Sequence, residues 1–547
     1  MRRKLKYAAA AAAGVLLLLW LFCLPHDLFE GTTYSTVVTD RNGALLGARV
    51  ADDGQWRFPP RDTLPEKFVK ALVEFEDRTF FDHCGVSPRA LVRAAIQNIR
   101  NGRIVSGGST LTMQVIRLSR QKPRTLWQKL VETCMATRLE LRCSKEEILR
   151  LYAAHAPFGG NVVGIDAARW RYLGSDRTEL SWAEAATLAV LQNAPSSIHL
   201  ARNRDQLLAK RNRLLARLHA KGEIDEEDYA LALEESLIGE PYPMPQYAPH
   251  LVEWYDRKAH GQRTVTHIDR DLQHRMEEVL VRWNRELRQK GIRDLAAIIV
   301  EVESGEPAAY CGNSDLSFDR DGKWVDIARS PRSSGSILKP LLYAAALERG
   351  TILPNSLLPD VPMDFGGFAP KNFNGSFAGA IEADQALALS LNIPNVYLLK
   401  EYGILRFVET LREAGLKTLS RPADEYGLSL ILGGAEVTLV EITACYAKMA
   451  ACYRDSTRYP SFPLHDRIAL YRTFEAMREV VRPDEMDWRR ASSAQNIAWK
   501  TGTSYGSRDA WAIGLTPKYV IGVWAGNANG SGVADLTGAR IAGPVLF

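Results

Sequence analysis

The sequence predicts a multidomain protein with an N-terminal transmembrane helix, a mostly α-helical domain and a following α/β domain. Three observations lead to this fold class. An uncharged apolar stretch follows a basic N-terminus, helical periodicity runs through residues 64–200, and strand patterns begin after residue 264. A chain of 547 residues also exceeds the size of one hydrophobic core, so two or three domains are expected.

The composition is that of a folded, nearly neutral chain. Hydrophobic residues make up 46%, which excludes an intrinsically disordered protein. The net charge is +5, so a function based on positive charge requires local clustering. The cysteines include no CxxC pair, which argues against a zinc site, and we expect each to be a small buried side chain. They are Cys23, Cys84, Cys134, Cys143, Cys311, Cys445 and Cys452.

The first 25 residues have the composition of a membrane anchor. Residues 1–6 (MRRKLK) are basic and form the expected cytoplasmic tail, and residues 7–25 (YAAAAAAGVLLLLWLFCLP) carry no charge. As a helix, this stretch would measure about 28 Å, close to the hydrocarbon thickness of a bilayer. Everything after His26 would then face outward. A cleaved signal peptide is the alternative, but its apolar segment is usually shorter and ends at small residues.

Turn and capping signals mark the elements of the first domain. Residues 34–60 alternate apolar and polar side chains around Asn42-Gly43, which predicts a hairpin. Ser87-Pro88 has the pattern of a helix cap followed by the first helical residue. The sequences SKEE at 144 and SWAE at 181 are capping boxes that predict two further helix starts.

The second half has the pattern of a sheet domain. Residues 295–312 predict two strands around a turn, and two late strand-like stretches follow at 496–503 and 509–526. Strands at both ends with helices between them favour a single mixed sheet. Helices are expected at 336–349, 384–400 and 435–452. The expected segments are a cytoplasmic tail at 1–6, a transmembrane anchor at 7–25, a helical domain at 45–220, a linker at 221–263 and an α/β domain at 264–547.

Glu76 lies in a region that combines an acid with many hydrogen-bonding groups. The sequence EFEDRTFFDHCG places it at the end of an apolar helix face, where partial desolvation suits a general acid or base. A solvated helix-end acid is the simpler interpretation of any single Glu. Residues 106–114 (SGGSTLTMQ) then offer glycines, hydroxyls and an amide. The cations that follow could hold a diphosphate or form a basic surface at a membrane. They are Arg117, Arg120, Lys122, Arg124 and Lys129.

Residues 68–200 resemble the glycosyltransferase domain of the peptidoglycan polymerases. The matching motifs are EDRTFFDHCG, GGSTLTMQ, QKLVE and KEEILRLYAAHAPFGGN, in this order. The resemblance implies a lysozyme-like, mostly helical domain that polymerises lipid II. It makes Glu76 the general base for the acceptor 4-hydroxyl and Glu132 the second carboxylate, near the leaving diphosphate. The residues expected to bind this substrate are Ser109, Thr110, Gln114, Arg117 and Arg124.

Two positions depart from the family pattern. Gln128 stands where the third motif normally begins with Arg. Tyr152-Ala153-Ala154 replaces the usual Tyr-Leu-Asn, and the APFGGN that follows resembles the penicillin-binding protein 1C subgroup, which also lacks that Asn. These departures concern polymerase rate and substrate fit more than the reaction class.

Ser336 and Lys339 stand three residues apart in RSSGSILKP. The spacing alone decides nothing, because Ser119 and Lys122 repeat it in SRQK. One helical turn would bring Ser336 and Lys339 together, and a lysine of lowered pKa can take the serine proton. Pro340 is tolerated only in a first turn, which predicts a helix start near Ser336.

Two later motifs complete a known set. SLN at 390–392 and KTGTS at 500–504 follow Ser-x-x-Lys in the order found in penicillin-binding proteins and serine β-lactamases. Residues 264–547 therefore resemble a penicillin-binding transpeptidase domain with an antiparallel sheet, and the whole chain resembles a class A bifunctional penicillin-binding protein. The 1C type continues beyond this point, so we expect the domain to be C-terminally incomplete. The implied catalytic residues are Ser336, Lys339, Ser390, Asn392 and Lys500, with Thr501, Gly502 and Thr503 binding the peptide.

The expected function is therefore peptidoglycan synthesis by glycan polymerisation and peptide cross-linking. The expected location is the bacterial inner membrane, crossed once, with the catalytic domains in the periplasm. Expected partners are lipid II, nascent peptidoglycan, β-lactams and cell-wall synthesis proteins, but no nucleic acid. The sequence shows no dedicated metal site, although Mg²⁺ could assist diphosphate departure. The alternatives are a monofunctional polymerase with an idle second half, a penicillin-binding sensor or scaffold, and, least favoured, a β-lactamase.

Overall fold

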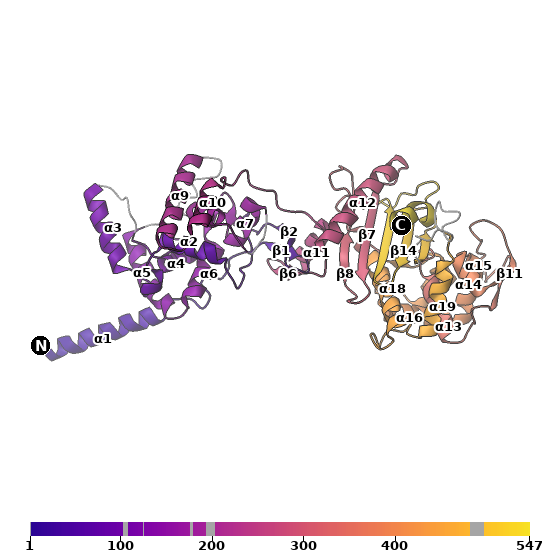
Figure 1. Cartoon of the computed structure of the whole chain (residues 1–547). Helices are drawn as coiled ribbons and strands as arrows, with labels where there is room; N and C mark the ends of the chain where they lie inside the picture. Colours follow the sequence, from indigo (N-terminus) through magenta and orange to yellow (C-terminus); the bar gives the residue numbers. More distant parts are fainter. Residues whose placement is uncertain (1, 102–107, 124, 175–178, 193–202, 482–496) are drawn as a thin grey trace. The chain divides into compact units, whose positions relative to one another are not determined.

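The computed structural model describes residues 2–101, 108–123, 125–174, 179–192, 203–481 and 497–547. The chain divides into two compact units (Figure 1). Unit 1 comprises Met1–Thr39, Gly47–Gln246 and Tyr255–Thr264, and unit 2 comprises Asp40–Leu46, Tyr247–Trp254 and Val265–Phe547.

Unit 1 is mostly α-helical, as predicted. Its helices are α1 (Arg2–Leu21), α2 (Glu66–Glu76), α3 (Pro88–Asn101), α4 (Leu111–Arg120), α5 (Leu126–Glu140), α6 (Lys145–His155), α7 (Ile165–Leu173), α8 (Trp182–Leu191), α9 (Arg204–Ala220) and α10 (Glu226–Glu234). The short strands are β1 (Thr36–Thr39), β2 (Leu45–Arg49), β3 (Trp56–Arg57), β4 (Pro157–Gly159), β5 (Val162–Val163) and β6 (Arg263–Val265), and β3, β5 and β4 form one sheet. The range 221–263, expected as a linker, also contains α10 and α11 (Pro249–Lys258).

The capping signals of unit 1 are confirmed. The hydroxyls of Ser144 and Ser181 each accept a hydrogen bond from the backbone N–H of the glutamate three residues later. The carboxylate of that glutamate accepts one from the serine backbone N–H, which completes two capping boxes. The Ser87 hydroxyl accepts from the backbone of Ala90 at the start of α3. Gly43 has a positive φ of 84° in the predicted turn between β1 and β2, a conformation that glycine adopts without steric cost.

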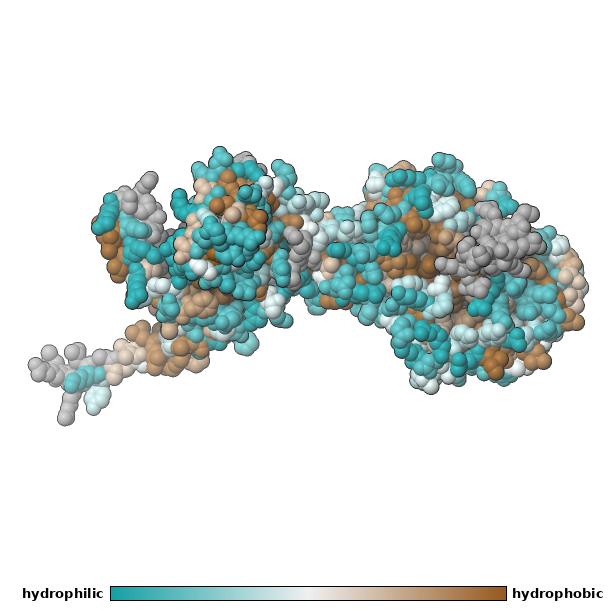
Figure 2. Space-filling model, viewed as in Figure 1, coloured by the Kyte–Doolittle hydropathy of each residue, from teal (hydrophilic) through white to brown (hydrophobic). Residues whose placement is uncertain are grey.

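Helix α1 covers Arg2–Leu21 rather than the expected residues 7–25. Figure 2 shows apolar side chains along its second half, and those of Leu16, Leu19 and Phe22 are exposed. Across the part of the chain that the structure describes, no helix combines the length and apolar character needed to cross a bilayer.

Unit 2 is built around a five-stranded sheet in the order β13-β14-β15-β7-β8. Every neighbouring pair is antiparallel, so the mixed sheet expected from the strand pattern is wrong and the antiparallel sheet implied by the resemblance is confirmed. The late stretch 509–526, expected as one strand-like run, contains two strands joined by a tight turn. The sheet strands are β7 (Asp294–Glu301), β8 (Pro307–Cys311), β13 (Ala498–Thr503), β14 (Asp509–Leu515) and β15 (Tyr519–Gly526).

Helices cover both faces of this sheet. The helices α12 and α20 contact one face and α18 the other. The described α-helices after residue 269 are α12 (Arg270–Gln289), α13 (Lys339–Glu348), α14 (Ala383–Ala388), α15 (Asn392–Tyr402), α16 (Ile404–Glu413), α17 (Ala423–Tyr426), α18 (Leu439–Arg454), α19 (Arg467–Arg478) and α20 (Gly543–Leu546). The short strands β9 (Arg332–Ser333) and β12 (Glu436–Val437) pair with each other, as do β10 (Leu357–Asp360) and β11 (Gly379–Glu382). The expected helix at 384–400 is two helices, α14 and α15, separated by Ser390.

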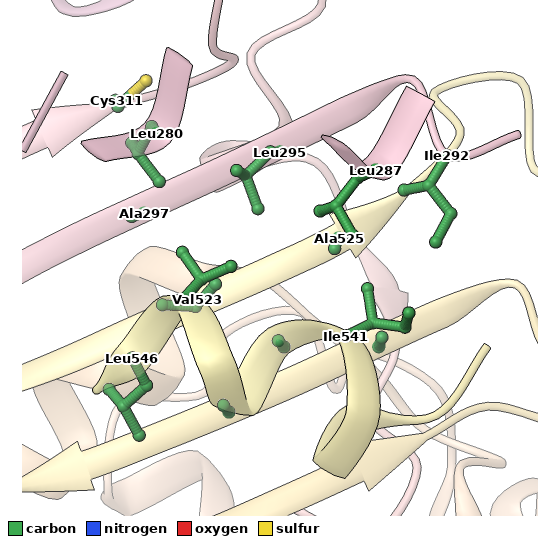
Figure 3. Close-up of a cluster of buried hydrophobic side chains, with 14 of the residues drawn as sticks. Leu280, Leu287, Ile292, Leu295, Ala297, Cys311, Val523, Ala525, Ile541 and Leu546 are labelled. Carbon is green, nitrogen blue, oxygen red and sulfur yellow. The ribbon is translucent and has the colours of Figure 1, made fainter. Parts of the chain in front are cut away.

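Successive sheet residues point to opposite faces, and this separates two cores. On one face, Leu280 of α12 lies with Val523 of β15 and with Leu546 of α20 (Figure 3). On the other face, α18 packs against β15, and a Cβ at Gly522 would lie 2.1 Å from Thr443 Oγ1. A glycine is therefore required at this close helix–sheet approach.

The cysteines differ from the expectation that all are buried. Cys311, Cys445 and Cys452 are buried, whereas Cys84 and Cys134 are exposed, so the expectation is wrong for these two. Both lie in unit 1, where helices α3 and α5 also expose large apolar side chains such as Ile99 and Trp127. Apolar character alone therefore does not bury a residue in this region.

Candidate active sites

Glu76 is the last residue of α2 and is linked to α4 through an amide. Gln114 Nε2 donates to Glu76 Oε2 at 2.7 Å, and Arg117 Nη2 donates to Gln114 Oε1 at 3.1 Å. Gln114 and Arg117 are one helical turn apart on α4, and the Gln114 amide links the guanidinium of Arg117 to the carboxylate of Glu76. The structure therefore brings together an acid, an amide and a cation that the sequence had placed in separate motifs.

Tyr152, on helix α6, lies close enough to Glu76 and Arg117 to be affected by their charges. Burial, with a smaller contribution from the negative charge of Glu76, raises the pKa of the Tyr152 hydroxyl well above its ordinary value. The hydroxyl therefore stays neutral and can only donate or accept a hydrogen bond. Glu76 is half-buried, in agreement with the expectation of a partly desolvated carboxylate.

The start of α4 is held by Asp77 and His83. Asp77 Oδ2 accepts from His83 Nε2 at 3.0 Å and from the backbone N–H of Leu111, the first residue of α4, at 3.1 Å. This contact fixes the helix that carries Gln114 and Arg117. Sequence reasoning missed the role of His83, although the residue lies in the motif EDRTFFDHCG, because a motif does not show which side chains face each other.

The other predicted polymerase residues lie around the same helix. Thr110 is the N-cap of α4, accepts from Met113 N–H and donates to Gly85 O at 2.6 Å, so its hydroxyl is used inside the protein. Ser109 is half-buried beside it, and Glu132 is half-buried on α5, which packs against α4. Arg124 lies outside the described residues. The substrate-binding roles of these residues stay predictions.

In unit 2, Ser336 lies in a turn and not in the helix. Helix α13 begins at Lys339, with Pro340 in its first turn, so the prediction of a helix start near Ser336 is early by one turn. The turn is held from both sides, because Trp511 Nε1 donates to Ser333 O at 2.9 Å and Tyr446 Oη donates to Ile337 O at 2.7 Å. The serine is therefore presented by a rigid turn.

Gly335 allows this turn to lie directly against β13. Its φ is +52°, and a Cβ at this position would lie 2.6 Å from the Thr503 backbone nitrogen. Only glycine avoids both the strain and the clash. The backbone around Ser336 is thus brought beside Thr503, and backbone N–H groups placed together in this way can form an oxyanion hole.

Lys339 is fully buried and donates three hydrogen bonds. Its Nζ donates to Ser390 O at 2.8 Å, to Leu391 O at 3.1 Å and to Asn392 Oδ1 at 2.9 Å. Burial, followed by the positive charge of Lys500, lowers the pKa of Lys339 well below its ordinary value. Burial and the neighbouring cation thus destabilise the charged form of Lys339, the residue that the sequence predicts to act as the base.

Ser390 connects the two lysines. Lys500 Nζ, also fully buried, donates to Ser390 Oγ at 2.8 Å and to Thr501 O at 2.9 Å, and burial lowers the pKa of Lys500 to about 7. Ser390 has a positive φ of 55° between α14 and α15, a strained conformation for serine that is often seen at functional sites. Its carbonyl thus faces Lys339 and its hydroxyl faces Lys500.

Residues 501–503 lie on an edge of the sheet. Strand β13 is the first in the sheet order, so its outer side is not paired with another strand of that sheet. Thr503 Oγ1 accepts from the Gly538 N–H at 3.0 Å, and Gly502 packs against Ser334. An unpaired edge can bind an extended peptide by strand addition.

Two family models match the chain. The model described as transglycosylase matches residues 43–219, and the model described as penicillin binding protein transpeptidase domain matches residues 295–545. These matches contain Glu76 and Glu132 in the first region and Ser336 and Lys500 in the second.

Curated and solved proteins show the same relationship. The chain is 39% identical over 516 residues to penicillin-binding protein 1C of Escherichia coli K12, covering 93% of this chain and 67% of that protein. It is 29% identical over 541 residues to penicillin-binding protein 1B of Vibrio cholerae, covering 90% and 69%. The crystal structure of penicillin-binding protein 1A from Haemophilus influenzae has a TM-score of 0.52 and 17% identity, covers 93% of this chain and 90% of that chain, and supports the fold.

Proposed function

Because this chain belongs to the class A penicillin-binding proteins, we propose that Glu76 and Ser336 initiate its two reactions. The chain is a bifunctional enzyme of peptidoglycan synthesis, with one domain that joins sugars and one that binds penicillin and cross-links peptides.

In the polymerase reaction, Glu76 takes the proton from the 4-hydroxyl of the incoming lipid II sugar. The oxygen then attacks the anomeric carbon of the growing strand, and the bond to the lipid diphosphate breaks. Gln114 orients the carboxylate through its 2.7 Å hydrogen bond. Arg117, and Arg124 outside the described residues, balance the charge of the departing diphosphate, with Glu132 as the second carboxylate near it.

In the transpeptidase reaction, neutral Lys339 takes the proton of Ser336, whose oxygen attacks the penultimate D-Ala carbonyl. The tetrahedral oxyanion is stabilised by the backbone N–H groups of Ser336 and Thr503. Ser390 and Lys500 return a proton to the departing D-Ala, and an amine from a neighbouring strand takes the acyl group. The carrying observation is that two buried lysines and Ser390 form one hydrogen-bonded network beside the Ser336 turn.

Membrane anchoring and Mg²⁺ belong to the same proposal. The uncharged residues 7–25 support a single-pass anchor in the inner membrane, with both domains in the periplasm. Among the described residues, no cluster of three or more His, Cys, Asp or Glu could hold a metal. A Mg²⁺ ion would be held by the substrate diphosphate and one carboxylate, Glu132, and would offset negative charge on the leaving group. Further cell-wall synthesis proteins are proposed as partners from the family alone.

Incubating the full chain with lipid II, with and without penicillin, tests the proposal. Without penicillin we expect cross-linked glycan strands, and with penicillin we expect strands of the same length without cross-links. Absence of any strand would contradict the polymerase assignment. Penicillin labelling without cross-linked product would instead favour a penicillin-binding sensor.

The pH dependence of acylation provides a separate prediction for Lys500. The charge of Lys500 contributes to the lowered pKa of Lys339, so Lys500→Ala should raise that pKa. Because Lys339 acts in its neutral form, the acid limb of the pH profile of acylation should shift to higher pH. The maximal acylation rate should also fall. Penicillin acylation measured between pH 5 and 9 checks this, and an acid limb that stays in place would contradict the role of Lys500 as the neighbouring cation.

A further inference from the structure

Asn372 is a buried side chain in the loop between β10 and β11, with an exposed fraction of 3%. Its Oδ1 accepts from the backbone N–H groups of Asn392, at 3.0 Å, and Ile393, at 3.4 Å, the first two residues of α15. Its Nδ2 donates to Asp360 Oδ1 at 2.6 Å and to Ser376 O at 3.0 Å. Both donors and both acceptor sites of the amide are therefore used.

Helix α15 depends on this distant side chain for its cap. The residue at its N-cap position is Leu391, which has no side-chain oxygen to accept from the first backbone N–H groups. Asn372 supplies that oxygen from a loop twenty positions earlier in the chain. The start of α15 is therefore positioned by the loop and not by its own sequence.

The loop itself is fixed by Asp360. This carboxylate is 1% exposed, accepts from Asn372 through Oδ1, and accepts from the backbone N–H of Ala378 at 2.8 Å through Oδ2. Asp360 lies at the end of β10 and Ala378 just before β11, so one carboxylate closes the loop at its base. The acceptor character of Asp360 also determines which way the Asn372 amide points.

Helix α15 begins with Asn392, and Asn392 holds Lys339. Asn392 Oδ1 accepts from Lys339 Nζ at 2.9 Å, and its Nδ2 donates to Lys371 O at 2.8 Å, so the same loop orients its amide. We infer that Asn372 is a positioning residue for acylation, which sets the place of Asn392 and thereby the orientation of Lys339. The inference rests on the proposed role of Lys339 as the base for Ser336.

A swap of the buried pair tests this inference in the full chain. Asn372→Asp places a second carboxylate against Asp360 and breaks their hydrogen bond. The acylation rate constant at saturating fluorescent penicillin should fall about tenfold, because a misplaced base slows the chemical step, while the concentration of half-saturation stays unchanged. The double variant Asp360→Asn with Asn372→Asp restores the hydrogen bond between positions 360 and 372, but not the one to Ser376 O, and should recover the rate to within about threefold of wild type.

Asn374→Asp is the matched control, because it adds the same charge to the same loop. Asn374 is exposed, and among the described residues its side chain accepts only from Ser376 N–H. It should acylate like wild type. Should Asn372→Asp fail to fold in a thermal melt, Asn372→Ser removes the amide that bonds Asp360 and caps α15 without adding a charge, and it must also slow acylation.

Wild-type rates in Asn372→Asp, or a double variant as slow as the single one, would overturn the inference. Wild-type protein that is not labelled at Ser336 would instead refute the proposed function itself.

Discussion

Replacing Ser336 by alanine should eliminate the covalent adduct that the full chain forms with a fluorescent penicillin. In the proposed mechanism the Ser336 oxygen is the atom that becomes acylated, and the turn held by Trp511 and Tyr446 presents it. Loss of the nucleophile in serine enzymes costs at least about a thousandfold in rate. Labelling followed by denaturing gel electrophoresis measures the effect, because only a covalent adduct survives denaturation.

Ser119→Ala is the matched control for this variant. Ser119 has the same spacing to a lysine, but its hydroxyl donates to Ile116 O at 2.9 Å within α4. Its replacement should leave labelling unchanged. A persistent adduct in Ser336→Ala would assign the acylation to another residue and would remove the basis for Lys339 as the base.

For the site around Ser336, the sequence predicted which residues would come together better than it predicted which of them contact one another. Helical spacing predicted that Lys339 would face Ser336, and that reasoning considers only neighbours three or four residues apart. In the structure, the three hydrogen bonds of Lys339 go to residues 390–392, more than fifty positions away. The tertiary fold decides such contacts, so no local pattern could have predicted them.

Ser390 shows a second limit of sequence reasoning. The stretch 384–400 has a continuous helical pattern, and the prediction of one helix was wrong because Ser390 adopts a positive φ. A serine rarely adopts this conformation without support from the surrounding structure. Here Lys339 and Lys500 each bond one of its oxygens, and those bonds cross the domain.

The first site was easier to predict because its elements carry local signals. Capping residues correctly placed the starts of α6 and α8, and the motif EDRTFFDHCG placed Glu76 at the end of α2. The pairing of Glu76 with Gln114 joins two helices that are separated by α3 in the sequence. That contact depends on how α2 and α4 pack, which no spacing rule describes.

Replacing Glu76 by glutamine should reduce glycan polymerisation from lipid II by about a hundredfold to ten-thousandfold. Glutamine has the size of glutamate, and its amide can still accept the hydrogen bond from Gln114 Nε2, so the helix packing should be kept. It cannot take a proton from the acceptor hydroxyl, and the attack on the donor sugar then lacks its base. The length distribution of the glycan product, separated by gel electrophoresis, measures the loss.

Glu66→Gln is the control for that experiment, because Glu66 begins the same helix and its side chain is 80% exposed. Within the described part of the chain, it pairs only with Lys70. It should polymerise lipid II like wild type. In Glu76→Gln, penicillin labelling of Ser336 should also be unchanged, which shows that unit 2 is folded, and a thermal melt checks unit 1. Near-normal polymerisation by Glu76→Gln would mean that the Glu76 carboxylate binds substrate but is not the base. Asp77 could not act as a substitute base, because the Asp77 carboxylate already accepts from His83 and from the Leu111 backbone N–H.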